Sequence, residues 1–357
     1  MKQMWFVPSR DELRRAAHLV CSALIAVPLL AACGSPAAVT ATGPTEAYEA
    51  ALTRVVATAL RSEPPTPTAS PVPATAIFTS DPPPETWLDL PYASRSEAQR
   101  LDLFVPQAGG PHPFILYAHA GSWAVGDKAE ASEFGIVAYF VQRGYAVASV
   151  NYRLSGEATF PAAVRDLKVA TRWLRAHATE YRLDSARIAA WGNSAGGNLV
   201  SMLGTTCGVP NFEGEQLGFA EQSSCVQAVI DWSGPMDFLA MDEQLERVGC
   251  PTGHSQGNSL ESDYMGFPIL TNPVAVHEAN PITYVSADDP PFLIQHGTAD
   301  CTVPPAQSEM LYDALTPVIG SDRVVLNLLR GVEHNGPEFS FSANLGLVLA
   351  FLRAYLQ

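Results

Sequence analysis

From about residue 86 to residue 357, segments typical of β-strands alternate with segments typical of helices. The expected strands in the second half of this region are continuous apolar runs, without alternation of apolar and polar residues. Such runs are typical of a parallel sheet whose two faces are both covered by helices. The sequence therefore predicts one doubly wound α/β domain of about 270 residues, with a mostly parallel sheet.

Eight strands and five helices are expected in this domain. The expected strands are 87–90, 101–105, 114–118, 146–151, 188–191, 226–232, 292–295 and 324–329. The expected helices are 133–143, 162–177, 195–203, 305–315 and 339–356. The stretch 235–290 is long, polar and glycine-rich, and we interpret it as an insertion between the sixth and seventh strands, over one end of the sheet.

The N-terminal segment is basic and precedes an uncharged apolar run at 19–32. This run is too short to span a bilayer comfortably, but it suits the apolar region of a secretory signal peptide. It ends in Leu30-Ala31-Ala32-Cys33, and small residues before a cysteine resemble the lipobox of bacterial lipoproteins. The resemblance implies that residues 1–32 are removed and that Cys33 carries a lipid such as palmitate. An ordinary signal peptide cut near Ala32 and an uncleaved anchor are the alternatives.

A proline-rich segment follows this signal. Ten of the 29 prolines lie between residues 34 and 86, among many Ala and Thr residues. Proline removes backbone donors and interrupts helices, so this composition favours an extended spacer. We therefore expect residues 33–85 to be a tether and residues 86–357 to be the folded domain, held to the outer side of a bacterial membrane by the lipid.

The charge of the chain narrows the classes of partner. Thirty-six acidic residues against 21 basic ones give a net charge of −15, which disfavours binding to the phosphates of nucleic acids. No CxxC motif or pair of histidines has the spacing of a metal site, so neither a metal nor another cofactor is expected.

Two segments match the pattern G-x-S-x-G, around Ser194 and around Ser255. In a hydrolase with this motif, the serine lies on a sharp turn between a strand and a helix. Ser194 follows the expected strand 188–191 and precedes the expected helix 195–203, whereas neither element flanks Ser255. We therefore predict Ser194 as a nucleophile; the alternative is that its glycines only mark the start of a helix.

A serine hydroxyl needs a base that accepts its proton and an acid that orients this base. Asp300 follows the expected strand 292–295, at the sheet edge where open α/β sheets place their chemistry. His334 lies in the loop between the last expected strand and the last helix. These two residues are the predicted acid and base. The weaker candidates for the acid are Asp237, Asp288 and Asp289, and His296 is interpreted as a packed structural histidine.

A serine that attacks a carbonyl carbon also needs backbone N–H groups that stabilise the oxyanion formed. Ala195, directly after Ser194, offers one such group. The turn of small residues after the expected strand 114–118 could direct others toward the serine.

Together these segments make the region 86–357 resemble bacterial esterases of the α/β-hydrolase fold, near the hormone-sensitive-lipase-like group and the feruloyl and acetyl-xylan esterase-like groups. The segments that carry the resemblance are HAGSW at 119–123, NYRL at 151–154, WGNSAGGN at 191–198, DWSGPMD at 231–237, HGTADCTVP at 296–304 and VEHNGPEF at 332–339. The resemblance implies a Ser194–Asp300–His334 triad and, by position, oxyanion donors at Gly121 and Ser122. The family's His-Gly-Gly-Gly turn is altered here by Ala120, and Asn335 stands where a glycine is frequent.

Four cysteines remain in the expected domain, an even number in an exported protein. They permit three pairings. We favour Cys207 with Cys225, which would close a polar loop, and Cys250 with Cys301, which would tie the insertion to the residue beside Asp300.

These features together predict a serine carboxylic-ester hydrolase that works through an acyl-enzyme. Export favours environmental esters, such as acyl groups on carbohydrate, as substrates. The alternatives are a serine peptidase of the prolyl-oligopeptidase type, for whose additional propeller domain the chain has no room, and a non-catalytic surface protein.

Overall fold

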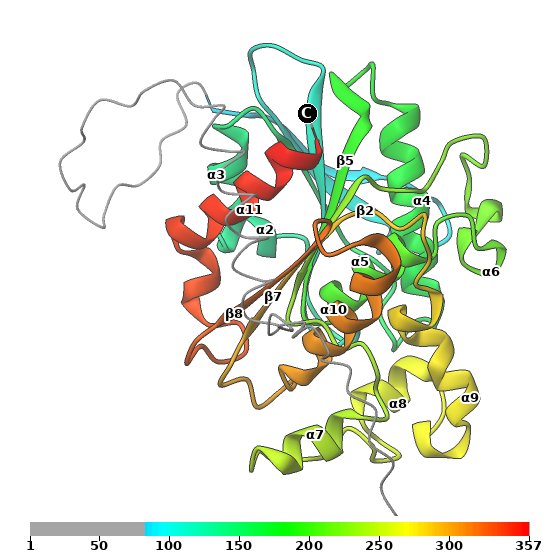
Figure 1. Ribbon diagram of the computed structural model, residues 1–357. Coiled ribbons are helices and arrows are strands. Elements are labelled where there is room, and N and C mark those ends of the chain that lie inside the picture. Colours follow the sequence, from blue (N-terminus) through cyan, green and yellow to red (C-terminus); the bar gives the residue numbers. More distant parts are fainter. Residues whose placement is uncertain (1–82, 357) are drawn as a thin grey trace, which may run out of the picture. The chain divides into compact units, whose positions relative to one another are not determined.

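The computed structural model describes residues 83–356 (Figure 1). They form an eight-stranded sheet in the order β1-β2-β4-β3-β5-β6-β7-β8, in which β2 is antiparallel to both β1 and β4 and all other neighbours are parallel. The strands are β1 (Glu85–Pro91), β2 (Arg100–Val105), β3 (His112–Ala118), β4 (Ala146–Val150), β5 (Leu183–Asn193), β6 (Ala228–Trp232), β7 (Phe292–Gly297) and β8 (Val324–Leu329). The predicted mostly parallel sheet of eight strands is confirmed.

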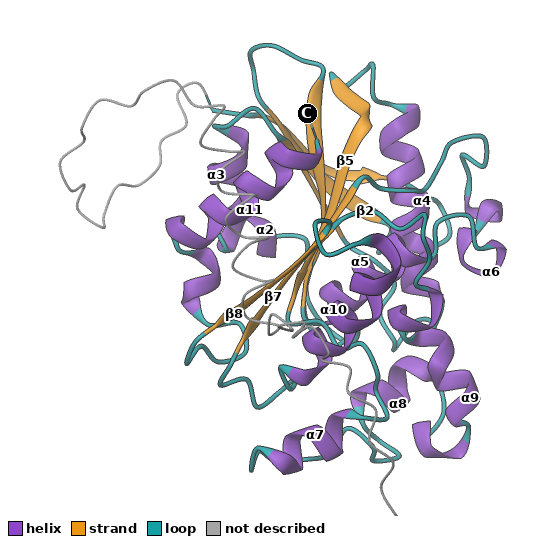
Figure 2. Cartoon of the chain, viewed as in Figure 1, coloured by secondary structure: helices purple, strands orange, loops and turns teal. Residues whose placement is uncertain are grey.

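Helices cover both faces of the sheet (Figure 2). One face carries α4 (Ala162–Ala176), α5 (Ala195–Thr205) and α10 (Ala306–Ile319). The other carries α3 (Ile136–Val141) and α11 (Ser342–Tyr355). Successive side chains of a strand point to opposite faces of the sheet. In β3, Leu116 therefore packs in the apolar core under α4, α5 and α10, and Tyr117 packs in the core under α3 and α11. This double burial explains why the central strands are apolar without alternation.

One expected helix has different bounds. The helix expected over 133–143 is α3, which begins only at Ile136, and a separate short helix, α2 (Glu130–Glu133), precedes it. Gly135 separates them with a φ of 71°, a left-handed conformation that glycine adopts without steric cost. The expected last helix is also corrected, since residues Pro337–Ser340 form a 3-10 turn and α11 begins at Ser342.

The insertion lies between β6 and β7, as expected, and it contains several short helices. Its α-helices are α7 (Met241–Arg247), α8 (Leu260–Met265) and α9 (Pro273–Val276), which Figure 1 shows together beyond one end of the sheet. Tyr264 of α8 stacks on Trp123, with 4.4 Å between the ring centroids. Phe238, just after β6, packs against the same tryptophan at 5.2 Å. These rings fix the insertion over the turn that follows β3.

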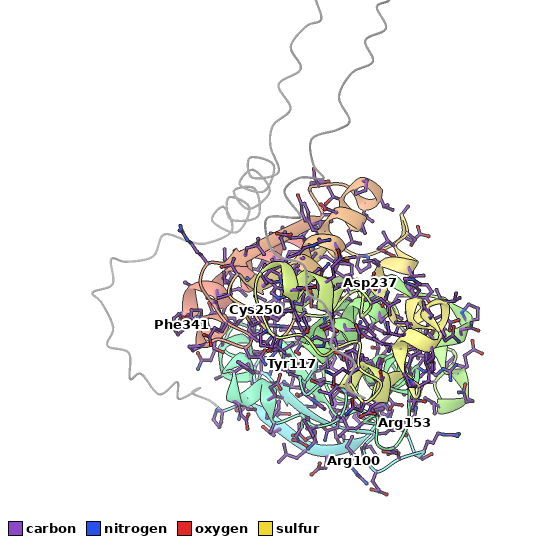
Figure 3. The ribbon with its side chains drawn as sticks, turned by 90° about the horizontal axis from the view of Figure 1, so that it is seen from below. Arg100, Tyr117, Arg153, Asp237, Cys250 and Phe341 are labelled. Carbon is purple, nitrogen blue, oxygen red and sulfur yellow. A yellow bond between two sulfur atoms is a disulfide. The ribbon has the colours of Figure 1, made fainter. Side chains whose placement is uncertain are left out.

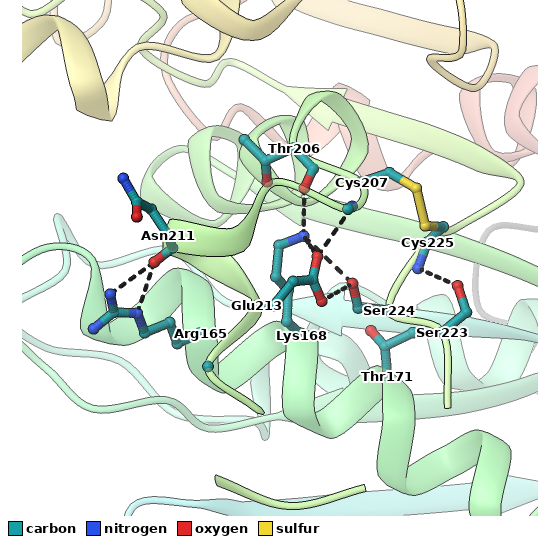
Figure 4. A network of polar contacts seen from close by, with 12 residues as sticks. Arg165, Lys168, Thr171, Thr206, Cys207, Asn211, Glu213, Ser223, Ser224 and Cys225 are labelled. Carbon is teal, nitrogen blue, oxygen red and sulfur yellow. Dashed lines mark hydrogen bonds and ion pairs between the residues drawn. A yellow bond between two sulfur atoms is a disulfide. The ribbon is translucent and has the colours of Figure 1, made fainter. Parts of the chain in front are cut away.

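Two disulfides join the pairs of cysteines favoured from the sequence, Cys207 with Cys225 and Cys250 with Cys301. The first closes a loop beside a buried ion pair (Figure 4). There the fully buried Lys168 of α4 donates hydrogen bonds to Glu213 Oε1 at 2.8 Å and to the carbonyl of Thr206 at 2.7 Å. Burial lowers the pKa of Lys168, and Glu213 counteracts this effect. Structural disulfides are typical of proteins that fold outside the cytoplasm.

Residues 1–82 lie outside the described residues, and with them lie the predicted signal peptide, Cys33 and nearly all of the predicted tether. Between residues 83 and 356, no helix combines the length and apolar character needed to cross a membrane.

Candidate active site

Ser194 occupies a strained turn between β5 and α5. Its backbone has φ 55° and ψ −118°, a conformation that non-glycine residues rarely adopt. The turn is this sharp because its glycines let backbones touch: a Cβ on Gly192 would lie 2.1 Å from the carbonyl oxygen of Gly196, and a Cβ on Gly196 would lie 2.1 Å from that of Ala118. The Ser194 N–H donates to the carbonyl of Trp232 on β6 at 2.7 Å. The neighbouring strands therefore hold the serine hydroxyl at the carboxyl edge of the sheet.

The two other predicted residues meet Ser194 at this edge. His334 Nε2 lies 2.9 Å from Ser194 Oγ, and His334 Nδ1 lies 2.6 Å from Asp300 Oδ2. A carboxylate beside Nδ1 requires the proton on that nitrogen, which leaves Nε2 free to accept the serine proton. The order Ser, Asp, His along the chain and the chain of two hydrogen bonds match the arrangement in which a histidine acts as general base.

Asp300 is fixed by more contacts than the sequence indicated. Its Oδ1 accepts the N–H groups of Thr302 and Val303 at 2.8 and 2.9 Å. His296 Nε2 lies 3.2 Å from Oδ2 and 2.9 Å from the carbonyl of Val303, so this nitrogen carries a proton. Burial of Asp300 opposes its ionisation, but the hydrogen bonds from His296 and His334 hold the pKa of the carboxyl below its ordinary value. An ionised, fully hydrogen-bonded carboxylate is what an orienting acid requires.

His296 is buried, as expected of a packed histidine, and it also contacts the predicted acid. This second contact is not apparent from the sequence. The alternative acids lie elsewhere: Asp289 is bound to Ser286, and Asp237 (labelled in Figure 3) accepts from Asn280 at 3.1 Å. Asp289 holds a local turn, and Asp237 also accepts the N–H of Leu239 at 3.1 Å.

The predicted oxyanion donors lie in two neighbouring turns. Gly121 and Ser122 follow β3, which pairs with β5 in parallel, so this turn and the Ser194 turn leave the same edge of the sheet. Gly121 has φ 119°, and a Cβ there would lie 2.0 Å from the carbonyl oxygen of Val125, so only glycine fits. Ala195 is the first residue of α5, where an N–H has no acceptor within the helix.

Ser255 has different surroundings. It lies in a loop of the insertion in which Asp242 accepts the N–H groups of Gly253, His254 and Ser255 at 2.8–2.9 Å. Burial acts against ionisation of Asp242, but these hydrogen bonds hold its pKa down at about 2. His254 is engaged with Glu261 at 2.7 Å. The second G-x-S-x-G segment is therefore a loop folded around a carboxylate, with no strand or helix that would project its serine.

Sequence reasoning assigned no role to Asp231, which lies behind the Ser194 turn. It is fully buried on β6, next to the residue that accepts the Ser194 N–H. Its Oδ1 accepts the N–H of Gly234 at 3.0 Å, whereas its Oδ2 has no partner among the described residues. Burial raises the pKa of Asp231 to about 7. The only indication of Asp231 in the sequence was an acidic residue within the apolar strand β6.

Comparison with known proteins places this geometry in a family. A sequence model of the BD-FAE family matches residues 101–315. The chain belongs to the BD-FAE family. The matched region begins in β2 and ends within α10, so it includes the turns at Ser194 and Asp300. The α/β-hydrolase fold expected from the resemblance is confirmed by solved structures of the same architecture.

Individual proteins that are similar to the BD-FAE chain include several esterases. The probable carboxylic ester hydrolase LipM of Mycobacterium tuberculosis is 31% identical over 233 residues, which are 64% of this chain and 52% of LipM. A carbohydrate esterase from gut microbiota superposes with a TM-score of 0.70 at 30% identity, over 77% of this chain and 98% of that one. Esterase 2 of Thermogutta terrifontis with bound butyrate superposes with a TM-score of 0.56 at 26% identity, over 77% of this chain and 93% of that one. The chain spans about half the length of the curated relatives it matches.

The buried acid makes stability depend on pH. The pKa of Asp231 rises from 3.8 to about 7 on folding, so between these values the unfolded chain releases a proton that the folded chain keeps. The free energy of unfolding therefore falls as pH rises through this window. We expect Asp231→Asn to increase the free energy of unfolding by about 1–4 kcal/mol at pH 8 and by progressively less toward pH 4.

Urea unfolding of both proteins across this pH range measures the difference. Asp288→Asn, at an exposed site, is the control and should show no such pH-dependent gain. A stability difference between Asp231→Asn and wild type that stays constant from pH 4 to pH 8 would contradict the raised pKa.

Proposed function

We propose that this chain is a serine carboxylic-ester hydrolase. The observation that carries the proposal is the position of His334, whose two ring nitrogens lie within hydrogen-bond distance of Ser194 and Asp300. The esterases and ester hydrolases among its relatives support the same activity. The proposed catalytic residues are Ser194, Asp300 and His334, with oxyanion donors at Gly121, Ser122 and Ala195.

In the proposed reaction, Ser194 Oγ attacks the ester carbonyl carbon while its proton passes to His334 Nε2. Asp300 stabilises the imidazolium that forms. The negative charge moves to the former carbonyl oxygen, where N–H groups of the two turns stabilise it. The tetrahedral intermediate expels the alcohol, which takes the proton from His334. Water then attacks the acyl-serine by the same route and releases the carboxylic acid and the free serine.

We infer that the natural substrates are acyl groups on carbohydrate. One support is the similarity to a carbohydrate esterase and to a bifunctional GH43-CE protein of Bacteroides eggerthii. A second support is a surface cavity of about 510 Å³ that borders the turn of Gly121 and Ser122 at Ala124 and is otherwise lined by Ser155, Gly156, Asp263 and Phe267 among others; Ser194 and His334 do not line it. Hydroxyl, carboxylate and backbone groups beside one aromatic ring suit a sugar, which has polar edges and apolar faces.

Loss of the nucleophile tests the activity. Ser194→Ala removes the attacking oxygen and is expected to reduce kcat for p-nitrophenyl acetate by at least about 10³-fold. Ser255→Ala, in the other G-x-S-x-G segment, is the matched control and should turn over like wild type. Turnover that survives Ser194→Ala would overturn the proposal, as would loss of turnover in Ser255→Ala.

We also propose that Cys33 is lipidated and that residues 33–85 form a tether to a bacterial membrane. The disulfides support a location outside the cytoplasm, and the sequence before Cys33 supports the lipid. Cells grown with labelled palmitate should label the wild-type protein and leave Cys33→Ala unlabelled. Equal labelling of the two proteins would exclude the lipid at this cysteine.

A further inference from the structure

Glu130, the first residue of α2, reaches back to the two turns of the candidate site. Its Oε1 accepts the hydroxyl of Tyr117 at 2.8 Å, and its two oxygens accept the N–H of Ala120 at 3.1 and 3.0 Å. Asn193 Nδ2 donates to Oε1 at 3.4 Å, the longest of these contacts. The donors come from β3, from the start of the oxyanion turn and from the residue before Ser194.

The segments on either side of this carboxylate are both strained. Directly after Ala120, three successive residues have positive φ: Gly121 at 119°, Ser122 at 52° and Trp123 at 58°. Directly after Asn193, Ser194 has φ 55°. Backbone in such regions persists only where its surroundings determine it. Glu130 holds the residue that precedes each strained segment, so one side chain fixes both starting points.

The other side of the oxyanion turn is also held. Tyr152 stacks on His119, with ring centroids 4.3 Å apart, and donates to the carbonyl of His119 at 2.9 Å. His119 and Ala120 are therefore fixed between Tyr152 on one side and Glu130 on the other. This arrangement leaves little freedom to the N–H groups of Gly121 and Ser122.

We propose that Glu130 is a positioning residue that sets the placement of the oxyanion turn relative to the Ser194 turn. The inference rests on the proposed ester-hydrolase function and deepens it. Glu130 has no contact with Ser194, Asp300 or His334, so it acts through the backbone donors. Because these donors stabilise charge that develops only in the transition state, their misplacement lowers kcat and leaves substrate binding nearly unchanged.

The hydrogen-bonding capacity of Glu130 fits this role. Burial raises the pKa of its carboxyl, and the hydrogen bonds from Tyr117, Ala120 and Asn193 act against the rise. An ionised carboxylate can accept from all three donors at once, because both of its oxygens are acceptors. A glutamine keeps one acceptor oxygen, for which Tyr117, Ala120 and Asn193 would compete, and its NH₂ group in place of Oε2 would face the N–H of Ala120 without accepting it.

The substitution Glu130→Gln tests the inference with little change of shape. Removing a whole oxyanion donor costs about 10²–10³ in kcat, so a displaced turn is expected to cost about 10–100-fold for p-nitrophenyl acetate, with KM within about twofold of wild type. Affinity for an arylboronic acid, whose tetrahedral adduct with Ser194 places an oxygen toward the same donors, should fall in parallel. Glu133→Gln, exposed on the same short helix, is the matched control and should match wild type in all three quantities.

Several results would overturn the inference. One is a kcat of Glu130→Gln within twofold of that of Glu133→Gln. Another is a fall in kcat that only follows the fraction of unfolded protein, measured by thermal denaturation. If Glu130→Gln does not fold, Asn193→Ala removes the hydrogen bond between Asn193 and Glu130 and should lower kcat about 3–10-fold at unchanged KM. An unchanged kcat of Asn193→Ala would reject the inference.

The failure of the inference can be distinguished from failure of the proposed function. If wild-type turnover disappears in Ser194→Ala while Glu130→Gln stays fully active, the function stands and the positioning role is wrong. If wild type shows no Ser194-dependent turnover and forms no boronate adduct, the proposed function fails and the inference is rejected with it.

Discussion

The structure depends on the sharp turn at Ser194, which is possible only because backbones touch on either side of it. Gly192 and Gly196 remove the Cβ atoms that would separate β5, α5 and β3. The carbonyl of Trp232 then accepts the N–H of the strained serine. This close packing fixes where the hydroxyl points, and the other groups of the site are arranged around that point.

Parallel strand order explains how distant parts of the chain reach this turn. β3, β5, β6, β7 and β8 are parallel neighbours, so the segments after them leave the sheet at one edge. The turn with the proposed oxyanion donors follows β3, Ser194 follows β5, Asp300 follows β7 and His334 follows β8. The negative charge of Asp300 at this edge is stabilised by hydrogen bonds from two backbone N–H groups and two histidines.

The sequence predicted what depends on local pattern. Apolar runs located the eight strands, and the ends of those runs located Ser194 and Asp300, because chemistry in such sheets lies after strands. The helix expected over 133–143 begins only at Ile136, because the conformation of Gly135 outweighs the apolar pattern around it. The helices of the insertion were missed since their apolar residues, such as Tyr264, pack against distant Trp123 and leave only a weak local period.

The contacts that could not be predicted are those between residues far apart in sequence. Glu130 looks like a surface residue of a short helix, and only the fold brings it to Asn193, 63 residues away. Asp231 reads as one polar residue in an apolar strand, and its raised pKa comes from burial that the sequence does not specify. His296 was placed correctly in the core, but its contact with Asp300 depends on how the loop after β7 folds back.

We propose that the geometry around Ser194 makes this one hydroxyl a nucleophile. A fluorophosphonate phosphonylates activated serines, and digestion followed by mass spectrometry identifies the modified residue. We expect a single stoichiometric adduct on Ser194, formed far more slowly in His334→Ala because the serine proton then has no acceptor. An adduct on Ser255, or labelling of Ser194 at an equal rate in His334→Ala, would contradict it.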